Sequence, residues 1–178
     1  MQPAAPSRSF PSEASGKRGL WLAAVFFALV AWTGGANADD PSRARLKHDP
    51  RYILESVARK MNVTLRTDEP MPRIYYESST PLAQFQEAVS PQWRFRPPMF
   101  ANVYVMARNE IYLSDDAGYY RRIRRTLDES LAHEFAHYLQ VRYYASNLVD
   151  ESCETEAVSI QIAFREENQL PYAPGEAG

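Results

Sequence analysis

The sequence contains an HExxH motif, beginning at His133 and ending at His137, that strongly restricts how the surrounding chain can fold. On an α-helix, residues four apart differ by about 40° around the axis, so both imidazoles lie on one face, one turn apart. Two ligands of a single zinc ion need this arrangement. The motif therefore predicts a helix, and apolar residues at spacings of four support it: Leu127, Leu131, Phe135 and Leu139.

Glu134 follows the first histidine of the motif. On a helix it lies about 100° from His133, close enough to reach a zinc-bound water without taking a coordination place. Zinc lowers the pKa of that water, and the carboxylate can accept its proton. We therefore predict Glu134 as a general base. His48, by contrast, is isolated in a polar stretch and is predicted to be a surface histidine.

A catalytic zinc ion usually has three protein ligands and one open position. Four acids follow within 20 residues of the motif: Asp150, Glu151, Glu154 and Glu156. With Glu154 as zero on a helix, Glu156 lies near 200°, close to the angles of Ile160 and Phe164. A carboxylate on an apolar face needs a partner, and zinc is one. This phase predicts Glu156 as the third ligand; an ion pair with an arginine is the alternative, and Glu154 is expected on a solvated face.

The segment 131–140, followed by Glu154-Thr155-Glu156-Ala157, resembles the small gluzincins, a group of zincin metallopeptidases. The resemblance is to an uncharacterised, secreted bacterial type of these enzymes. In that family a glutamate on a following helix completes the zinc site, about 20 residues after the second histidine. The resemblance covers roughly residues 100–165. It implies His133, His137 and Glu156 as ligands of one zinc ion and Glu134 as general base.

Two related families fit less well. Metzincins need glycine and histidine at fixed places after the motif, where this chain has Gln140 and Tyr143. An aspartate ligand, as in aspzincins, would nominate Asp150 as the second choice. The chain also departs from larger gluzincins, because Ile160 occupies the place of their aspartate that orients a histidine. The acceptor that orients the ligand histidines here must come from elsewhere.

Hydrophobic periodicity predicts an α+β fold, and the resemblance implies that this fold is of the zincin type. We expect a helix from Asp49, short strands at 63–65 and 74–76, and a helix near Pro81. A hairpin at 103–114 should form the edge of a small twisted sheet, packed against the motif helix. The helix that carries the third ligand is expected to run from about Glu151 to Glu167. The resemblance also implies that an extended substrate lies along the edge hairpin.

The N-terminal residues 1–38 have the features of a secretory signal peptide. Basic residues precede an apolar core at 20–32, and Ala36-Asn37-Ala38 is a typical cleavage site. The core is shorter than the roughly 20 residues that span a bilayer, so a cleaved signal peptide is favoured over the alternative, an uncleaved membrane anchor, and we expect no stable span after cleavage. Export would place the protein in the periplasm or outside the cell. The single cysteine, Cys153, excludes an internal disulfide.

These features predict a flexible segment at 39–48, a metallopeptidase domain at 49–167 and a disordered tail at 168–178. The predicted function is secreted, zinc-dependent hydrolysis of peptide bonds through a zinc-bound water, with a peptide or protein substrate. The alternative is a zinc-stabilised, non-catalytic binding module of the cell envelope. A formal net charge of −2 gives no indication of a nucleic-acid partner.

Two further groups of residues have no assigned role from the sequence. The basic run 121–125 is expected to be a solvated face. Any of several tyrosines could stabilise an oxyanion, and three are near the motif in sequence: Tyr119, Tyr120 and Tyr143.

Overall fold

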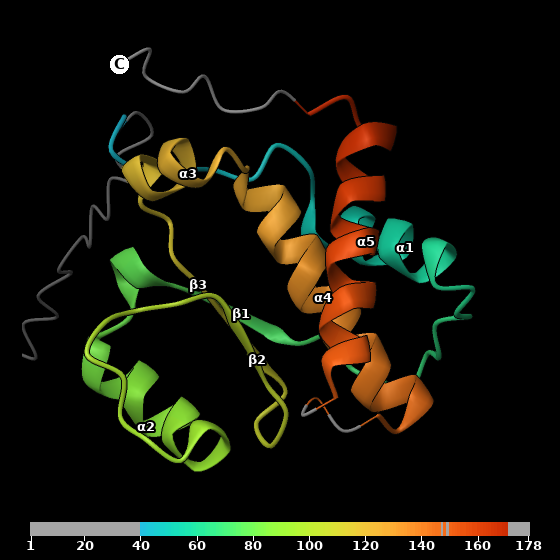
Figure 1. Cartoon of the computed structure of the whole chain (residues 1–178), viewed down its shortest axis with the longest axis horizontal. Coiled ribbons are helices and arrows are strands. Elements are labelled where there is room, and N and C mark those ends of the chain that lie inside the picture. The colour runs from blue at the N-terminus through green and yellow to red at the C-terminus, as the bar shows by residue number, and fades with distance from the viewer. Residues whose placement is uncertain (1–39, 147, 149, 171–178) are drawn as a thin grey trace, which may run out of the picture. The chain divides into compact units, whose positions relative to one another are not determined.

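The computed structural model describes residues 40–146, 148 and 150–170. Over this part the chain is α+β, as predicted (Figure 1). Its elements are α1 (Pro50–Lys60), β1 (Arg73–Tyr76), a 3-10 turn η1 (Glu77–Ser79), α2 (Leu82–Trp93), β2 (Val103–Val105), β3 (Glu110–Leu113), α3 (Ala117–Ile123), α4 (Leu127–Tyr144) and α5 (Glu151–Glu167). Within these residues no helix is long and apolar enough to cross a membrane.

The sheet has three strands in the order β1-β3-β2. The central strand β3 pairs in parallel with β1 and antiparallel with β2. The predicted hairpin is confirmed, with β2 at an edge of the sheet and Asn109 adopting a positive φ of 50° in the turn. Asparagine tolerates this left-handed conformation better than most residues, which explains the tight reversal.

Alternate residues of the hairpin face two different helical layers. Tyr104, Ile111 and Leu113 join the main core with α1, α4 and α5, whereas Val103, Val105 and Tyr112 pack beneath α2. This alternation follows from the two-residue period of a strand. In Figure 1, α2 accordingly lies on one side of the sheet and α4 on the other. The predicted apolar stripe of α4 is buried, as Leu127, Leu131, Phe135 and Leu139 are almost fully inaccessible.

The start of α4 is fixed by side-chain hydrogen bonds. Thr126 and Glu129 form a capping box, in which each side chain satisfies a backbone N–H of the other. The buried Asp128 carboxylate accepts from the backbone N–H groups of Lys47 (2.9 Å) and His48 (2.9 Å). The ring Nδ1 of His48 also contacts it at 2.8 Å. His48 is therefore a contact between the N-terminal segment and α4 rather than an isolated surface histidine.

Several local predictions are wrong or incomplete. Residues 63–65 form no strand; the chain leaves α1 there and the backbone N–H of Val63 bonds back to Ala58 (2.8 Å). The short helix α3 was not predicted. Leu170, assigned to a disordered tail, is buried in the main core. The flexibility of 39–48 stays a prediction, although Ala44 and His48 make backbone hydrogen bonds to the rest of the fold. The predicted signal peptide and residues 171–178 lie outside the described residues.

Candidate metal centre

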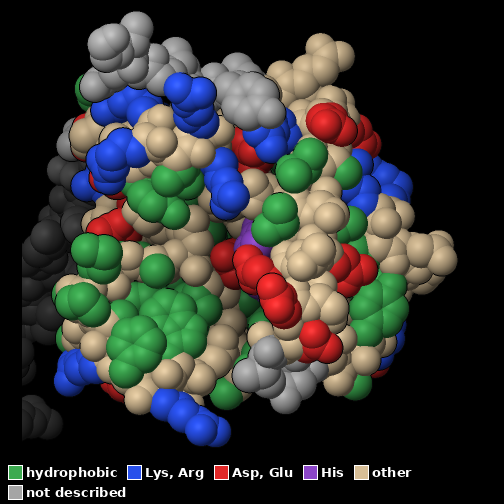
Figure 2. Space-filling model, viewed as in Figure 1, with side chains coloured by type: hydrophobic (Ala, Val, Ile, Leu, Met, Phe, Trp, Pro, Cys, Tyr) green, Lys and Arg blue, Asp and Glu red, His purple; other side chains and the backbone are tan. Residues whose placement is uncertain are grey.

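The two histidines of the motif lie together on α4, as their spacing predicts. The Nε2 atoms of His133 and His137 are 3.1 Å apart, and the rings are nearly perpendicular at 86°. Both side chains are mostly buried, with 13% and 12% of their surface exposed. Figure 2 shows a recessed histidine surface bordered by acidic side chains. The imidazoles therefore converge at a point that remains accessible from outside.

Glu154 on α5 completes the cluster. Its Oε1 lies 3.2 Å from Nε2 of His133 and its Oε2 lies 3.2 Å from Nε2 of His137. These three residues form the group whose ligand atoms all lie within 4.8 Å of one another. Zinc at about 2.0–2.1 Å from tetrahedral ligands separates neighbouring ligand atoms by roughly 3.3 Å. The observed separations match that value, so the donor set fits a zinc ion.

Glu156, the third ligand predicted from helix phase, lies elsewhere. Its side chain is exposed, and its Oε2 accepts a hydrogen bond from Nε2 of Gln140 at 2.9 Å. The prediction that Glu156 lies on the apolar face of α5 is wrong. The buried residues of that helix are Cys153, Ala157, Ile160, Gln161 and Phe164.

The error has a simple geometric cause. The centre of the buried face of α5 lies about 80° from Glu154 on one side and about 80° from Glu156 on the other. Both carboxylates therefore flank the core, and the way α5 crosses α4 determines which one meets the histidines. The structure brings Glu154, and not Glu156, next to the histidines. Asp150, the second choice, caps α5 by accepting from the backbone N–H of Ser152 at 2.9 Å.

Glu134 lies on the side of α4 that faces the sheet. Only 5% of the residue is exposed, and the backbone N–H of Tyr104 on the edge strand β2 donates to its carboxylate. Burial raises the pKa of Glu134 to about 8, and the negative charge of Glu154 acts in the same direction. A carboxyl group with a pKa near neutrality is suited to both accepting and returning a proton.

His133 is held in its neutral form. Burial lowers its pKa to about 4, and the neighbouring His137 contributes to the shift, whereas the Glu154 carboxylate opposes it. The positive charge of Arg125 also lowers this pKa, which places that side chain close to the centre. Because a metal binds the unprotonated nitrogen, a neutral imidazole at pH 7 is ready to coordinate without releasing a proton.

Two buried glutamines lie next to the imidazoles. Oε1 of Gln140 on α4 is 2.9 Å from Nδ1 of His137. Gln161 on α5 interacts with the side chain of His133. Neither residue was predicted. The spacing of three residues between His137 and Gln140 places them on one helix face and could have revealed the first contact; no sequence signal identifies Gln161.

The remaining candidates from the sequence have other contacts. The hydroxyl of Tyr120 is buried and donates to the carbonyl of Ser114 at 2.9 Å. The hydroxyl of Tyr143 accepts from the backbone N–H of Arg66 at 3.0 Å. Tyr119 packs edge-on against Tyr120. The basic run has Arg121, Arg122 and Arg124 exposed and Arg125 partly buried. Cys153 is buried.

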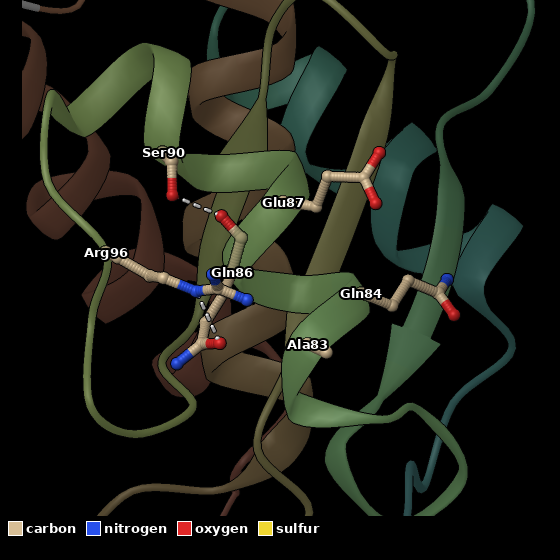
Figure 3. Close-up of a pocket in the computed structure, with 6 residues that line it drawn as sticks. All are labelled: Ala83, Gln84, Gln86, Glu87, Ser90 and Arg96. Carbon is tan, nitrogen blue, oxygen red and sulfur yellow. Dashed lines mark hydrogen bonds between the residues drawn. The ribbon is translucent and has the colours of Figure 1, made fainter.

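A separate surface pocket of about 650 Å³ lies along α2. Figure 3 shows Gln86 at its centre, where Oε1 accepts from Nε of Arg96 at 2.8 Å. The lining residues come from α2 and the loop after it, namely Ala83, Gln84, Gln86, Glu87, Ser90 and Arg96. The histidine centre, built from α4 and α5, therefore shares no residue with this pocket.

No protein-family model matches the chain, and neither a curated protein nor a solved structure matches it. The interpretation of the centre therefore depends on its own geometry.

Proposed function

We propose that this protein is a zinc-dependent peptidase, with His133, His137 and Glu154 as the metal ligands. The observation that carries the proposal is the convergence of two imidazole nitrogens and a carboxylate at 3.1–3.2 Å from one another. Gluzincin-like chemistry supports the same choice, because an HExxH helix followed by a glutamate on the next helix is its ligand pattern.

These three residues would hold a zinc ion, which would supply a Lewis acid to polarise the scissile carbonyl and lower the pKa of water. Glu134 accepts the proton of the attacking water and delivers it to the nitrogen of the leaving amine. Its place next to His133 on α4, almost fully buried, favours this role.

The edge strand β2 is the proposed place for an extended peptide substrate. An edge strand offers unpaired backbone groups to a peptide. On β2, however, Gln92 already donates to the carbonyl of Tyr104 at 3.0 Å and accepts from the N–H of Met106 at 3.1 Å. The N–H of Tyr104 also donates to Glu134, so a peptide that leaves Gln92 and Glu134 in place would pair only with residues before Tyr104.

The direct test measures zinc content and peptide cleavage in the same preparation. The purified protein should contain one zinc ion per chain and cleave casein or a mixed peptide library. Glu134→Gln should retain the zinc and lose cleavage, whereas Glu166→Gln, an exposed carboxylate of α5, should retain both. Equal cleavage by the wild type and Glu134→Gln would refute Glu134 as the general base.

A zinc-stabilised module without catalysis is the second candidate. The small exposed fraction of Glu134 favours it, because a centre that joins α4 to α5 can serve as a cross-link without a base that water reaches. Stoichiometric zinc, a large loss of thermal stability on chelation and no cleavage of any library peptide would support this candidate over the enzyme.

We also propose that the protein is exported. The proposal depends on the signal-like pattern of residues 1–38. N-terminal sequencing of the protein from a cell-envelope fraction should begin at Asp39; an intact N-terminus at Met1 would contradict it.

A further inference from the structure

Gln140 is a buried side chain whose amide makes three polar contacts. Its Nε2 lies 2.8 Å from the carbonyl oxygen of Cys153 and 2.9 Å from Oε2 of Glu156. Its Oε1 lies 2.9 Å from Nδ1 of His137. The residue is almost fully inaccessible, so water does not compete for these partners. The side chain thus joins the ligand histidine of α4 to the first turns of α5.

The chemistry of these partners constrains the position of each hydrogen. A carbonyl and a carboxylate only accept hydrogen bonds, so the group that contacts Cys153 and Glu156 must be the amide nitrogen. The amide oxygen consequently faces His137. Because that oxygen also only accepts, its contact requires a hydrogen on Nδ1 of His137, whereas the Glu154 carboxylate, 3.2 Å from Nε2, favours the other tautomer in the metal-free protein. With the hydrogen on Nδ1, the lone pair of the neutral imidazole is on Nε2, the atom that faces His133 and Glu154.

We propose that Gln140 is a positioning residue that holds His137 in its Nδ1–H tautomer and directs Nε2 into the metal centre. Glu156 and the Cys153 carbonyl hold the amide of Gln140 in the orientation that this requires. Glu156 thereby acts on the metal centre indirectly, through Gln140 and His137. The tautomer does not depend on the proposed function, whereas its consequence for zinc affinity does.

His133 has a matching arrangement with Gln161. Nδ1 of His133 and Oε1 of Gln161 are both buried and have no hydrogen-bond partner of good geometry among the described residues. A hydrogen on Nδ1 of His133, donated to Oε1 of Gln161, would satisfy both atoms. Each imidazole would then have an uncharged amide oxygen behind it, in place of the carboxylate that commonly fulfils this role.

The tautomer is measured directly by long-range ¹H–¹⁵N NMR of the metal-free full-length protein at pH 8. The Nδ1 resonance of His137 should have the shift of a protonated nitrogen and Nε2 that of an unprotonated one. Free imidazole side chains in water favour the opposite tautomer, so the result discriminates. An Nε2–H tautomer in the wild type would overturn the proposal, and this spectrum requires no variant.

Gln140→Leu, which keeps bulk but cannot accept, should shift His137 toward the Nε2–H tautomer and weaken zinc binding roughly 10- to 100-fold. Exchange of the two side chains in Gln140→Glu/Glu156→Gln restores an acceptor for Nδ1–H and should restore the tautomer and the affinity. Glu156→Ala should give a mixture of tautomers, while Glu166→Ala on the exposed face of α5 should match the wild type.

The metal centre and the positioning role of Gln140 can be refuted separately. A wild-type protein with the Nδ1–H tautomer but without zinc binding would refute the metal centre and leave the role of Gln140 intact. Zinc binding with a tautomer that Gln140→Leu does not change would refute the positioning role and leave the metal centre intact.

Discussion

Replacement of Glu134 by glutamine is expected to stabilise the metal-free protein while it abolishes hydrolysis. The carboxyl group is buried between α4 and β2, where ionisation is unfavourable. Glutamine has nearly the same shape, can still accept the N–H of Tyr104, and never ionises. The variant therefore keeps the packing and removes the cost of a buried charge.

The sign follows from the two pKa values. Burial raises the pKa of Glu134 from 4.5 to about 8, so between these values the folded state holds a proton that the unfolded state has released. The free energy of unfolding of the wild type therefore falls as pH rises through this window. At about 1.4 kcal/mol per pH unit, the cost is roughly 1 kcal/mol at pH 5, roughly 3 at pH 7 and roughly 5 at pH 9.

Urea denaturation in the presence of a chelator measures this difference for the wild type and Glu134→Gln. His133 changes the free energy of unfolding in the opposite direction with pH. Because burial lowers its pKa to about 4, the stability that it contributes is lost as pH falls from 6.5 towards 4. That contribution is common to both proteins and cancels in their difference. Glu166→Gln serves as the exposed control. A difference between Glu134→Gln and the wild type that does not change between pH 5 and 9 would refute the reasoning.

Three further experiments test the surroundings of the centre. Glu154→Ala should reduce zinc affinity, measured by calorimetry, well beyond the smaller loss expected for Glu156→Ala, and the reverse order would restore Glu156 as the ligand. Thr126→Ala removes the capping box of α4 and should cost about 1 kcal/mol in chemical denaturation. Asp128→Ala removes the buried acceptor of the Lys47 and His48 N–H groups and should cost roughly 3 kcal/mol, whereas His48→Gln should cost less than half of that; equal losses would contradict the assigned role of Asp128.

The local pattern of the sequence was sufficient for the helix that carries the motif. Its apolar stripe and its histidine spacing depend on the same helical repeat, and both follow from neighbouring residues alone. The edge hairpin was also predictable, because alternation on two short strands and an asparagine in the turn are local features. The failed strand at 63–65 had β-propensity but no pairing partner, and propensity alone does not form a strand.

Helix α5 could be predicted only in part from local sequence patterns. Its boundaries, Glu151–Glu167, agree with the prediction, yet its buried face was misjudged because Gln161 and Cys153 are part of it. A hydrophobic pattern cannot identify a polar residue that faces the core. Gln161 is buried because it lies beside His133, which is a tertiary contact.

The sequence by itself determined that two imidazoles and the carboxylate of Glu134 lie on α4 in fixed angular relation, because backbone hydrogen bonds set that relation within one turn. Only the tertiary structure decided that Glu154 meets the histidines and that Glu156 instead holds Gln140. The two acids flank the buried face of α5 almost symmetrically. The crossing of α5 over α4, which depends on packing across the whole core, determined which acid reached the centre.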